Sequence, residues 1–563
     1  MNTVIAAVLS LAAAGFLVLA AYVVHLAFIG PWLNPITRLP GPPGNRLIEM
    51  RHVMQVVDPR QSPHTHVRFV KNYGRNVYIR GPFPWDQRLF TLDPKAINHI
   101  LQNSTLYEKP EPSRRLISNL IGVGMLSAEG VTHKRQRRVA MAAFSIQTIR
   151  ALVPLAFSKG LTLKDKWAHV IRADGGEKSV IDVCDWASRA TFDMIGSAGF
   201  DYEFNAIQGG DDELLRAYVD MFDAVLSKNK RPFWRTIALY WPILDRIFPD
   251  ETTRFTAKCR AVIDRIAGDL IQEKKRKIAE AEEKGQNYQG KDLLTLLLKS
   301  NSSTEIPPEQ RISDEDILHT INTFMFAGTD TTSLALTWTI YLLSHFADVQ
   351  TRLRNDLMAL LPDTPLEKLT QEETQSLYAA IAEVPYLDNV IKETLRVIPP
   401  MHSSIRVATQ DDAVPISSPI KRKDELGNIV LDEATRVFVP KGTMIHVPVE
   451  GFNLDKEFWG ETAWNFNPDR WDDLPETVKD LPGLYNHLLT FSAGPRACMG
   501  MRMSLIEIKA FIFILLTNYT FSPSPEHKIG KANVVLTRPF VIGRENEGSM
   551  LPVIVTPYVR PVT

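Results

Sequence analysis

The chain is poor in cysteine and carries no net charge. Only three of its 563 residues are cysteine, Cys184, Cys259 and Cys498, and such a sparse, odd set suits a reducing compartment better than a disulfide framework. Lys and Arg together number 64, as do Asp and Glu, so the formal net charge is zero. A balanced charge gives no support to a nucleic-acid-binding protein, whose surface needs a basic excess.

The chain also lacks linkers and repeats. No Gly/Ser-rich segment and no internal repeat divides the body of the chain. Apolar residues make up 45% and charged residues 23%, which excludes a disordered chain and is enough for a large core. We therefore expect one large catalytic domain at residues 61–563.

Patterns typical of strands are confined to short stretches. Residues 77–80 and 88–92 predict one hairpin, residues 437–447 a second around Lys441-Gly442, and residues 534–541 with 551–555 a third. Helical spacing dominates the chain between the first hairpin and about residue 400. The fold expected is mainly α with minor β.

The N-terminus is the one long hydrophobic run. From Val4 to Ile29 the chain is almost continuously apolar, and this length spans a bilayer as a helix. We predict a transmembrane anchor at residues 1–30. The alternative is a cleaved secretory signal, but no Lys or Arg precedes the run and it exceeds an ordinary signal core.

The segment after this run predicts its orientation. Three positive charges follow it, Arg38, Arg46 and Arg51, which places the body on the cytoplasmic side. Prolines between residues 31 and 43 predict a stiff, non-helical spacer within a linker at residues 31–60. Three Asn-x-Ser/Thr sequences, at Asn103, Asn301 and Asn518, fit the glycosylation pattern, but a cytoplasmic body would leave them unmodified.

An aromatic and basic stretch at residues 233–248 is a candidate second membrane contact. Phe233, Trp234, Tyr240, Trp241 and Phe248 alternate there with arginines. Such a stretch suits the membrane interface beside a substrate entrance. Packing in the core is the alternative.

The most specific motif is a loop that presents one cysteine. It reads Phe491-Ser-Ala-Gly-Pro-Arg-Ala-Cys-Met-Gly500 and precedes an apolar helical run beginning near Met503. A thiolate is the soft ligand that haem iron accepts from cysteine, and the N–H groups at a helix start favour an anionic sulfur. Gly494 and Gly500 allow close approach to a flat ring, and Arg496 suits a haem propionate. An inert buried thiol is the alternative for Cys498.

This loop matches the Phe-x-x-Gly-x-Arg-x-Cys-x-Gly signature at every fixed position, so the chain resembles the haem-thiolate monooxygenases, the cytochrome P-450 superfamily. It is most similar to fungal-like microsomal members. The resemblance implies a helix bundle around haem b with small sheets, behind an N-terminal transmembrane helix. It also implies that Cys498 is the axial ligand of the haem iron and that Phe491 and Gly494 belong to the cofactor-binding loop.

A second motif lies within a long apolar helix. Ser313 is a typical N-cap, and the apolar run that follows continues toward Leu343 through Ala327-Gly-Thr-Asp-Thr-Thr332. Buried polar groups are costly unless satisfied or functional. The segment resembles the superfamily's oxygen-groove motif, which implies that Asp330 relays protons and that Thr331 binds dioxygen and water. A kink satisfied by Ser/Thr bonding to the backbone is the alternative.

A third motif joins two distant segments. Glu393 and Arg396 lie on one helical face, which alone is weak evidence. Phe466-Asn-Pro-Asp-Arg-Trp471 supplies a further arginine, Arg470. The resemblance implies that Glu393, Arg396 and Arg470 form a buried structural triad that holds the cysteine loop against the helix bundle.

Haem propionates require cations. The resemblance assigns this task to His133, Arg137, Arg406 and Arg496. Around the first two lies a basic cluster, Lys134, Arg135 and Arg138, which predicts either a solvated face or a docking surface for an acidic flavoprotein electron donor.

The resemblance also brings a mainly apolar set of residues around the substrate. The set comprises 116–123, Phe324, Ala327, 401–405 and 539–540, with His402, Ser403 and Ser404 as polar handles. We expect a lipophilic substrate, namely a terpenoid or related secondary metabolite. Fatty acids, which need a cation such as Arg538, and planar xenobiotics stay open as alternatives.

The function expected is insertion of one atom of O2 into this substrate. Electrons come from NADPH through a separate FAD/FMN reductase, with cytochrome b5 as a further donor, at the endoplasmic reticulum membrane with the catalytic domain in the cytosol. A haem-thiolate isomerase or dehydratase is the nearest alternative, against which the Asp330-Thr331 pair argues. A haem sensor without turnover is the alternative of a different class, and it leaves the proton relay unexplained.

Overall fold

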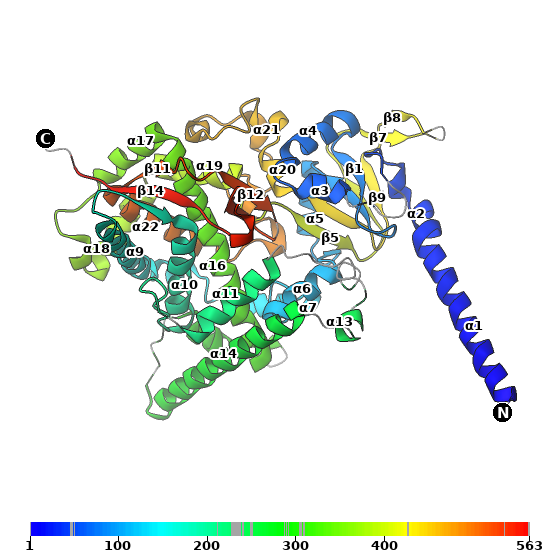
Figure 1. Cartoon of the computed structure of the whole chain (residues 1–563), viewed down its shortest axis with the longest axis horizontal. Helices are drawn as coiled ribbons and strands as arrows, with labels where there is room; N and C mark the ends of the chain where they lie inside the picture. Colours follow the sequence, from blue (N-terminus) through cyan, green and yellow to red (C-terminus); the bar gives the residue numbers. More distant parts are fainter. Residues whose placement is uncertain are drawn as a thin grey trace. The chain divides into compact units, whose positions relative to one another are not determined.

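The chain forms two compact units in a computed structural model (Figure 1). The first comprises residues 1–110, 402–460 and 477–497, and the second comprises 111–401, 461–476 and 498–563. The residues described are 2–44, 49, 51–210, 212–226, 238, 241, 243–247, 251–286, 288, 290, 292–302, 307, 310–424, 427–533 and 535–560. The aromatic and basic stretch at 233–248 lies largely outside them.

A five-stranded sheet organises the first unit, in the order β1-β2-β10-β5-β3. Its strands are β1 (Asn76–Arg80), β2 (Gln87–Thr91), β3 (Tyr107–Glu108), β5 (Ser404–Ala408) and β10 (Met444–Val447). β1 pairs antiparallel with β2 in the register Val77 to Phe90, which confirms the first predicted hairpin. β10 lies parallel to β2 and antiparallel to β5, so residues far apart in sequence complete the sheet.

The first unit contains further helices and strands. They are α1 (Asn2–Val24), η1 (His25–Ile29), α2 (Gly30–Leu33), η2 (Pro35–Arg38), α3 (Arg51–Val57), α4 (Ser62–Tyr73), α5 (Pro94–Gln102), β6 (Asp412–Pro415), β7 (Ile420–Lys423), β8 (Ile429–Asp432), β9 (Arg436–Val439), α20 (Val449–Asn453), α21 (Lys456–Trp459), η7 (Leu489–Phe491) and η8 (Gly494–Arg496).

The predicted hairpin around Lys441-Gly442 is wrong, although the turn exists. Thr443 N–H donates to the Pro440 carbonyl at 3.1 Å and Gly442 has a φ of +84°. The two flanking strands nevertheless enter different sheets, because β9 pairs with β6 while β10 pairs with β2 and β5. Gly442 N–H donates to the Ala408 carbonyl at 2.8 Å, so the turn leads directly onto β5.

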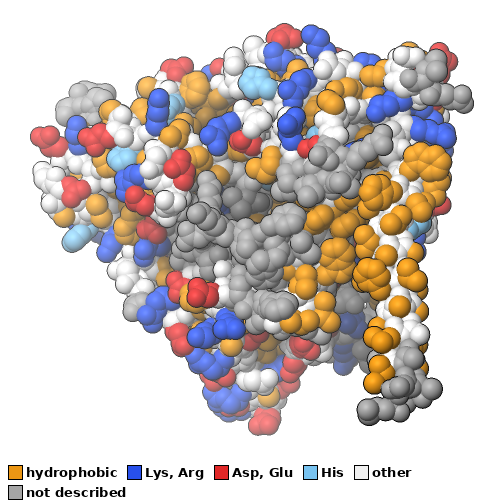
Figure 2. All heavy atoms as spheres, turned by 45° about the vertical axis from the view of Figure 1, so that its right-hand side comes forward, with side chains coloured by type: hydrophobic (Ala, Val, Ile, Leu, Met, Phe, Trp, Pro, Cys, Tyr) orange, Lys and Arg blue, Asp and Glu red, His pale blue; other side chains and the backbone are white. Residues whose placement is uncertain are grey.

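The N-terminal helical segment presents its apolar side chains outward (Figure 2). Residues Leu9–Leu33 are helical, have a mean hydropathy of 2.2 and are the one unbent helical run among the described residues long and apolar enough to cross a membrane. None of its most apolar window is buried in the protein. These properties are compatible with a membrane anchor. The spacer that follows is not wholly non-helical as predicted, because Pro31 lies in α2 and Pro35 begins η2, where proline fits the first helical positions.

Helices dominate the second unit. They are α6 (Glu111–Ile121), α7 (Gly130–Met141), α8 (Ile146–Arg150), α9 (Val153–Ala173), α10 (Val183–Phe200), α11 (Glu213–Leu226), α13 (Ile243–Ile247), α14 (Glu251–Glu283), α15 (Leu293–Ser302), α16 (Asp314–His345), α17 (Ala347–Met358), α18 (Gln371–Ala382), α19 (Pro385–Val397) and α22 (Met501–Asn518), with the 3-10 turn η5 (Pro468–Asp472).

Helix α16 is the core element of this unit. Ser313 caps it by accepting from Asp316 N–H at 3.1 Å, and Asp316 reciprocates in a capping box, as the sequence predicts for Ser313. The helix is unbroken from Asp314 to His345, and most of its residues are buried. It packs against α10, α14, α19 and α22.

Two small sheets complete the second unit. One has the order β11-β14-β4 and the other pairs β12 with β13. The strands are β4 (Ser179–Asp182), β11 (Tyr519–Pro523), β12 (Ile529–Asn533), β13 (Thr537–Val541) and β14 (Pro552–Pro557). The predicted pairing of 534–541 with 551–555 is therefore wrong. The partner of β13 is β12, where Gly530 leaves room for the Phe540 ring, since a Cβ on Gly530 would lie 2.4 Å from it.

Candidate functional site

Cys498 lies immediately before α22 in the second unit. It is exposed, whereas Cys184 and Cys259 are buried. Burial by surrounding protein atoms raises the pKa of the Cys498 thiol, while the N–H groups of Gly500 and Met501 and the charge of Arg137 oppose that rise. The first N–H groups of the helix that follows, those of Gly500 and Met501, are directed at this sulfur.

The residues before Cys498 belong to the first unit. Gly494 has a φ of +69°, and a Cβ there would lie 2.5 Å from the Leu101 carbonyl of α5, so this position requires glycine for its backbone. Phe491 is half-buried and packs edge-on against Tyr485, with ring centroids 5.6 Å apart. The backbone conformation explains why glycine occupies position 494, and packing against Tyr485 explains the aromatic ring at position 491. The cofactor contact of both residues stays a prediction.

Two predicted propionate partners share one face of α7. His133 and Arg137 are four residues apart, and His133 is buried while Arg137 is half-buried. Burial lowers the pKa of Arg137, and Cys498 opposes that effect, so the guanidinium lies within electrostatic reach of the sulfur. Both residues share the second unit with Cys498.

The basic cluster beside them is only partly available. Lys134 and Arg138 are exposed, whereas Arg135 forms an ion pair with Asp316 at 3.1 Å. A docking surface for an electron donor, as predicted from the charge cluster, would therefore use Lys134 and Arg138 more than Arg135.

The other two predicted cations belong to the first unit. Arg406 lies on β5, is buried, and donates from Nη1 to Ser404 Oγ at 2.5 Å and to the Ile405 carbonyl at 2.9 Å. Arg496 is half-buried in η8. The four predicted propionate partners are therefore divided between the two units.

The predicted proton relay lies at the middle of α16. Thr331 Oγ1 donates to the Ala327 carbonyl at 2.7 Å. This is the hydroxyl-to-backbone bond expected for the alternative interpretation of the motif, a helix kink. The helix does not break, and the neighbouring hydroxyl of Thr332 bonds Ser504 of α22 at 3.1 Å. The motif is therefore joined to the helix that follows Cys498 within a single unit.

Asp330 has a partner that the sequence did not indicate. Its Oδ2 accepts from Arg538 Nη2 of β13 at 2.5 Å, and the two side chains are 12% and 16% exposed. The sequence offers Arg538 only as a candidate cation for a fatty-acid carboxylate. Because its charge is already neutralised by Asp330, the structure gives no support to that use.

Residues of the proposed substrate pocket differ in exposure. Phe324 is buried and packs edge-on against Phe144 at a centroid distance of 5.1 Å, whereas Leu116 and Met401 are 37% and 40% exposed. Phe324 therefore has an aromatic neighbour, Phe144, that the sequence did not point to.

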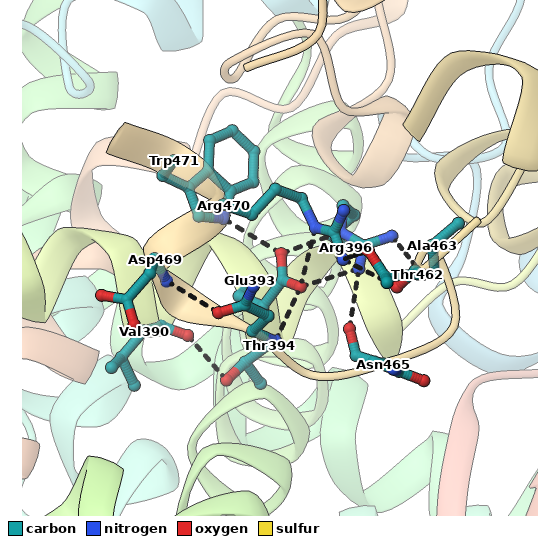
Figure 3. A network of polar contacts seen from close by, with 11 residues as sticks. Val390, Glu393, Thr394, Arg396, Thr462, Ala463, Asn465, Asp469, Arg470 and Trp471 are labelled. Carbon is teal, nitrogen blue, oxygen red and sulfur yellow. Dashed lines mark hydrogen bonds and ion pairs between the residues drawn. The ribbon is translucent and has the colours of Figure 1, made fainter. Parts of the chain in front are cut away.

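Glu393, Arg396 and Arg470 meet in the second unit (Figure 3). Glu393 is fully buried and accepts from Arg396 at 2.7 and 2.8 Å and from Arg470 Nε at 3.3 Å. Burial and the neighbouring Arg396 lower the pKa of Arg470, and Glu393 opposes this effect. One carboxylate thus compensates two buried cations.

The network extends beyond the predicted three residues. Trp471 Nε1 and the Asn467 N–H donate to Glu393, each at 3.0 Å, and Arg396 donates to the Ala463 carbonyl at 2.6 Å. Arg470 donates to the Thr462 carbonyl at 2.7 Å. The segment that these contacts fasten to α19 is residues 462–471; a contact to the cysteine loop stays a prediction.

The residues around Cys498 fit a haem group. An accessible sulfur, helix-start N–H groups directed at it and the nearby Arg137 provide a soft iron ligand and a cation for an anionic group. Asp330 and Thr331 add a carboxylate and a hydroxyl group on a largely buried helix of the same unit.

Comparisons with known proteins agree with this fit. A family model described as Cytochrome P450 matches residues 40–539. The chain is 37% identical to cytochrome P450 monooxygenase 128 of Postia placenta over 98% of each chain. It is 32% identical to cytochrome P450 monooxygenase claW of Ampulloclitocybe clavipes, covering 92% of each. It is 31% identical to ganoderic acid synthetase CYP5150L8 of Ganoderma lucidum, covering 89% of this chain and 91% of that one.

Proposed function

Since the chain belongs to the cytochrome P450 family and is a monooxygenase of that family, we propose that it oxidises a bulky lipophilic metabolite, such as a terpenoid. The electrons come from NADPH and are delivered by a separate FAD/FMN reductase. The observation that carries this proposal is the setting of Cys498, an accessible thiol that faces the N–H groups of Gly500 and Met501 beside the charge of Arg137. The relative that is a ganoderic acid synthetase supports a metabolite as substrate.

The residues of the chain prepare the site for its cofactor. Haem b, held by the Cys498 thiolate, would supply the activation of dioxygen and the transfer of one oxygen atom to a C–H bond, the second atom leaving as water. The N–H groups of Gly500 and Met501 stabilise the sulfur as an anion. His133, Arg137, Arg406 and Arg496 are proposed to hold the propionates, and Asp330 and Thr331 to deliver protons.

Thr331→Ala is expected to uncouple the reaction. Haem incorporation should be retained, while product per NADPH falls by about tenfold and hydrogen peroxide accounts for the lost electrons, because the hydroxyl that directs the proton is absent. Thr339→Ala is the matched control, since Thr339 Oγ1 makes the same bond to a carbonyl four residues back, Ala335, at 2.7 Å. Equal coupling in Thr331→Ala and Thr339→Ala would remove the proposed role of Thr331.

We also propose the endoplasmic reticulum membrane as the location, with a single N-terminal span and a cytosolic body. The positive charges that follow the span, Arg38 and Arg51 among them, support this orientation, because loops on the cytoplasmic side of a membrane carry an excess of Lys and Arg.

Deleting residues 1–30 is expected to release much of the protein from membranes, since about 20 apolar residues provide the insertion energy. In intact microsomes, added protease should digest the body of the full chain without detergent, while a lumenal marker stays protected. Protection of the body would show that the orientation is wrong.

Substrate class is tested by spin-state titration of the purified protein with terpenoids, fatty acids and planar aromatics, followed by product analysis with the reductase. A low-spin to high-spin shift and oxygenated product with a terpenoid is expected. Shifts confined to fatty acids or aromatics would contradict the substrate class. Substrate conversion without NADPH consumption would instead favour an isomerase or dehydratase.

A further inference from the structure

The ion pair between Arg538 and Asp330 is a built feature of the second unit. The guanidinium Nη2 lies 2.5 Å from Asp330 Oδ2, and both side chains are largely enclosed. Arg538 Nε is buried and has no hydrogen-bond partner among the described residues. The Nη2 donor of the arginine is therefore paired with Asp330, while its Nε donor stays unsatisfied. An unsatisfied buried donor costs stability, which favours a functional reason for the arginine over simple packing.

The strand carrying Arg538 is fixed at the preceding residue. Thr537 N–H donates to the Pro400 carbonyl at 2.8 Å and Thr537 Oγ1 to the Pro399 carbonyl at 2.8 Å. Its own carbonyl accepts from Trp338 Nε1 of α16 at 2.9 Å. One of these bonds goes to α16 and two go to the segment after α19, and together they set the position from which Arg538 reaches Asp330.

The pair also separates the two polar side chains of the α16 motif. Thr331 turns its hydroxyl to the Ala327 carbonyl of its own helix, whereas Asp330 turns its carboxylate to β13. The Thr329 carbonyl accepts from Thr191 Oγ1 of α10 at 3.0 Å, which fixes the backbone just before Asp330. Arg538 thus holds the carboxylate itself, while Thr191 holds the backbone from which the Asp330 side chain extends.

We propose that Arg538 is a positioning residue that fixes the Asp330 carboxylate on the β13 side of α16, so that a proton passes through Asp330 along one route. This inference rests on the proposed monooxygenase function. It assigns Arg538 to the proton relay and not to recognition of a substrate carboxylate, because the charge of Arg538 is already compensated.

Arg538→Gln removes the charge while keeping a polar side chain. Product per NADPH is expected to fall by about tenfold, because a general acid that is not held in place loses most of its contribution. The missing reducing equivalents leave as hydrogen peroxide, formed from O2 with two electrons and two protons. Arg538→Lys should recover much of the coupling. Arg544→Gln is the control, since Arg544 forms an exposed pair with Glu547 shortly after β13.

A cycle with Asp330→Asn separates positioning from general damage. If Arg538 acts through Asp330, the double variant releases the same fraction of electrons as peroxide as Asp330→Asn alone. The double variant should also lose less in thermal unfolding midpoint than the two single variants lose when their losses are added. The double variant leaves no unpaired charge, so it can be measured even if Arg538→Gln alone fails to fold.

Three results would overturn the inference: coupling in Arg538→Gln equal to that of Arg544→Gln, effects that add in the double variant, or no recovery with Arg538→Lys. Failure of the proposed function is separate, since it would show as a wild-type protein without a thiolate-type haem spectrum.

Discussion

Replacing Cys498 with serine is expected to abolish the thiolate-type spectrum and the monooxygenase activity together. A serine hydroxyl does not ionise at neutral pH and is a harder ligand than sulfur, so the electron donation that favours O–O cleavage is lost. The red-shifted Soret band of the reduced, CO-treated protein should disappear. Because burial raises the pKa of the Cys498 thiol, the thiol is expected to release its proton on binding iron.

The matched control is Cys259→Ser, which removes a sulfur of a buried cysteine elsewhere in the same unit. It should keep the red-shifted band, with any loss confined to stability. A thiolate-type band that persists in Cys498→Ser, or that disappears in Cys259→Ser, would contradict the assignment of the axial ligand.

Glu393→Gln is expected to destabilise the protein by roughly 3–5 kcal/mol, the cost of leaving a buried charge uncompensated. The amide keeps the shape of the side chain but removes the carboxylate charge that pairs with both Arg396 and Arg470. Glu393 also accepts from Trp471 and Asn467, so the fastening of residues 462–471 to α19 should weaken as a whole. A loss this large approaches the total stability of many domains, and poor soluble yield is expected.

Denaturant unfolding of the soluble fraction measures the effect. Asp469→Asn is the control, since Asp469 pairs with Arg352 at 2.6 Å but both side chains are more than half exposed. Exposed pairs contribute about 0–1 kcal/mol, so this variant should unfold near wild type. Equal stabilities of the two variants would show that the buried network is not what holds this segment.

Local signals predicted local structure well. Ser313 is predicted as an N-cap, and α16 begins directly after it. β1 and β2 follow one another in the sequence, so a local pattern was also enough to predict their hairpin. The two wrong strand pairings have different causes. β10 pairs with β2 and β5, which are distant in sequence and which a local alternation pattern does not contain. β13 pairs with its neighbour β12, a local hairpin that lies one strand earlier than the predicted one.

In the candidate site, too, local patterns revealed some residues, whereas others became visible only in the fold. Asp330 and Thr331 stand out because polar residues interrupt an apolar helix, but nothing near Arg538 in the sequence indicates that it pairs with Asp330, 208 residues earlier. Trp471 was visible within the motif that contains Arg470, yet its indole N–H becomes a partner of Glu393 only through the fold. Partners brought together by tertiary packing carry no spacing signal.

During synthesis, the five-stranded sheet of the first unit stays incomplete until its late strands have been made. Strand β2 finds its partner β10 through residues such as Arg88 and Met444. At about 5–20 residues per second, the ribosome needs roughly 20–70 s to travel between those two positions. Through that interval one edge of β2, a strand whose five residues all end up buried, has no partner strand. An unpaired strand edge of this kind is a template for aggregation, so yield should depend on chaperones that shield nascent chains.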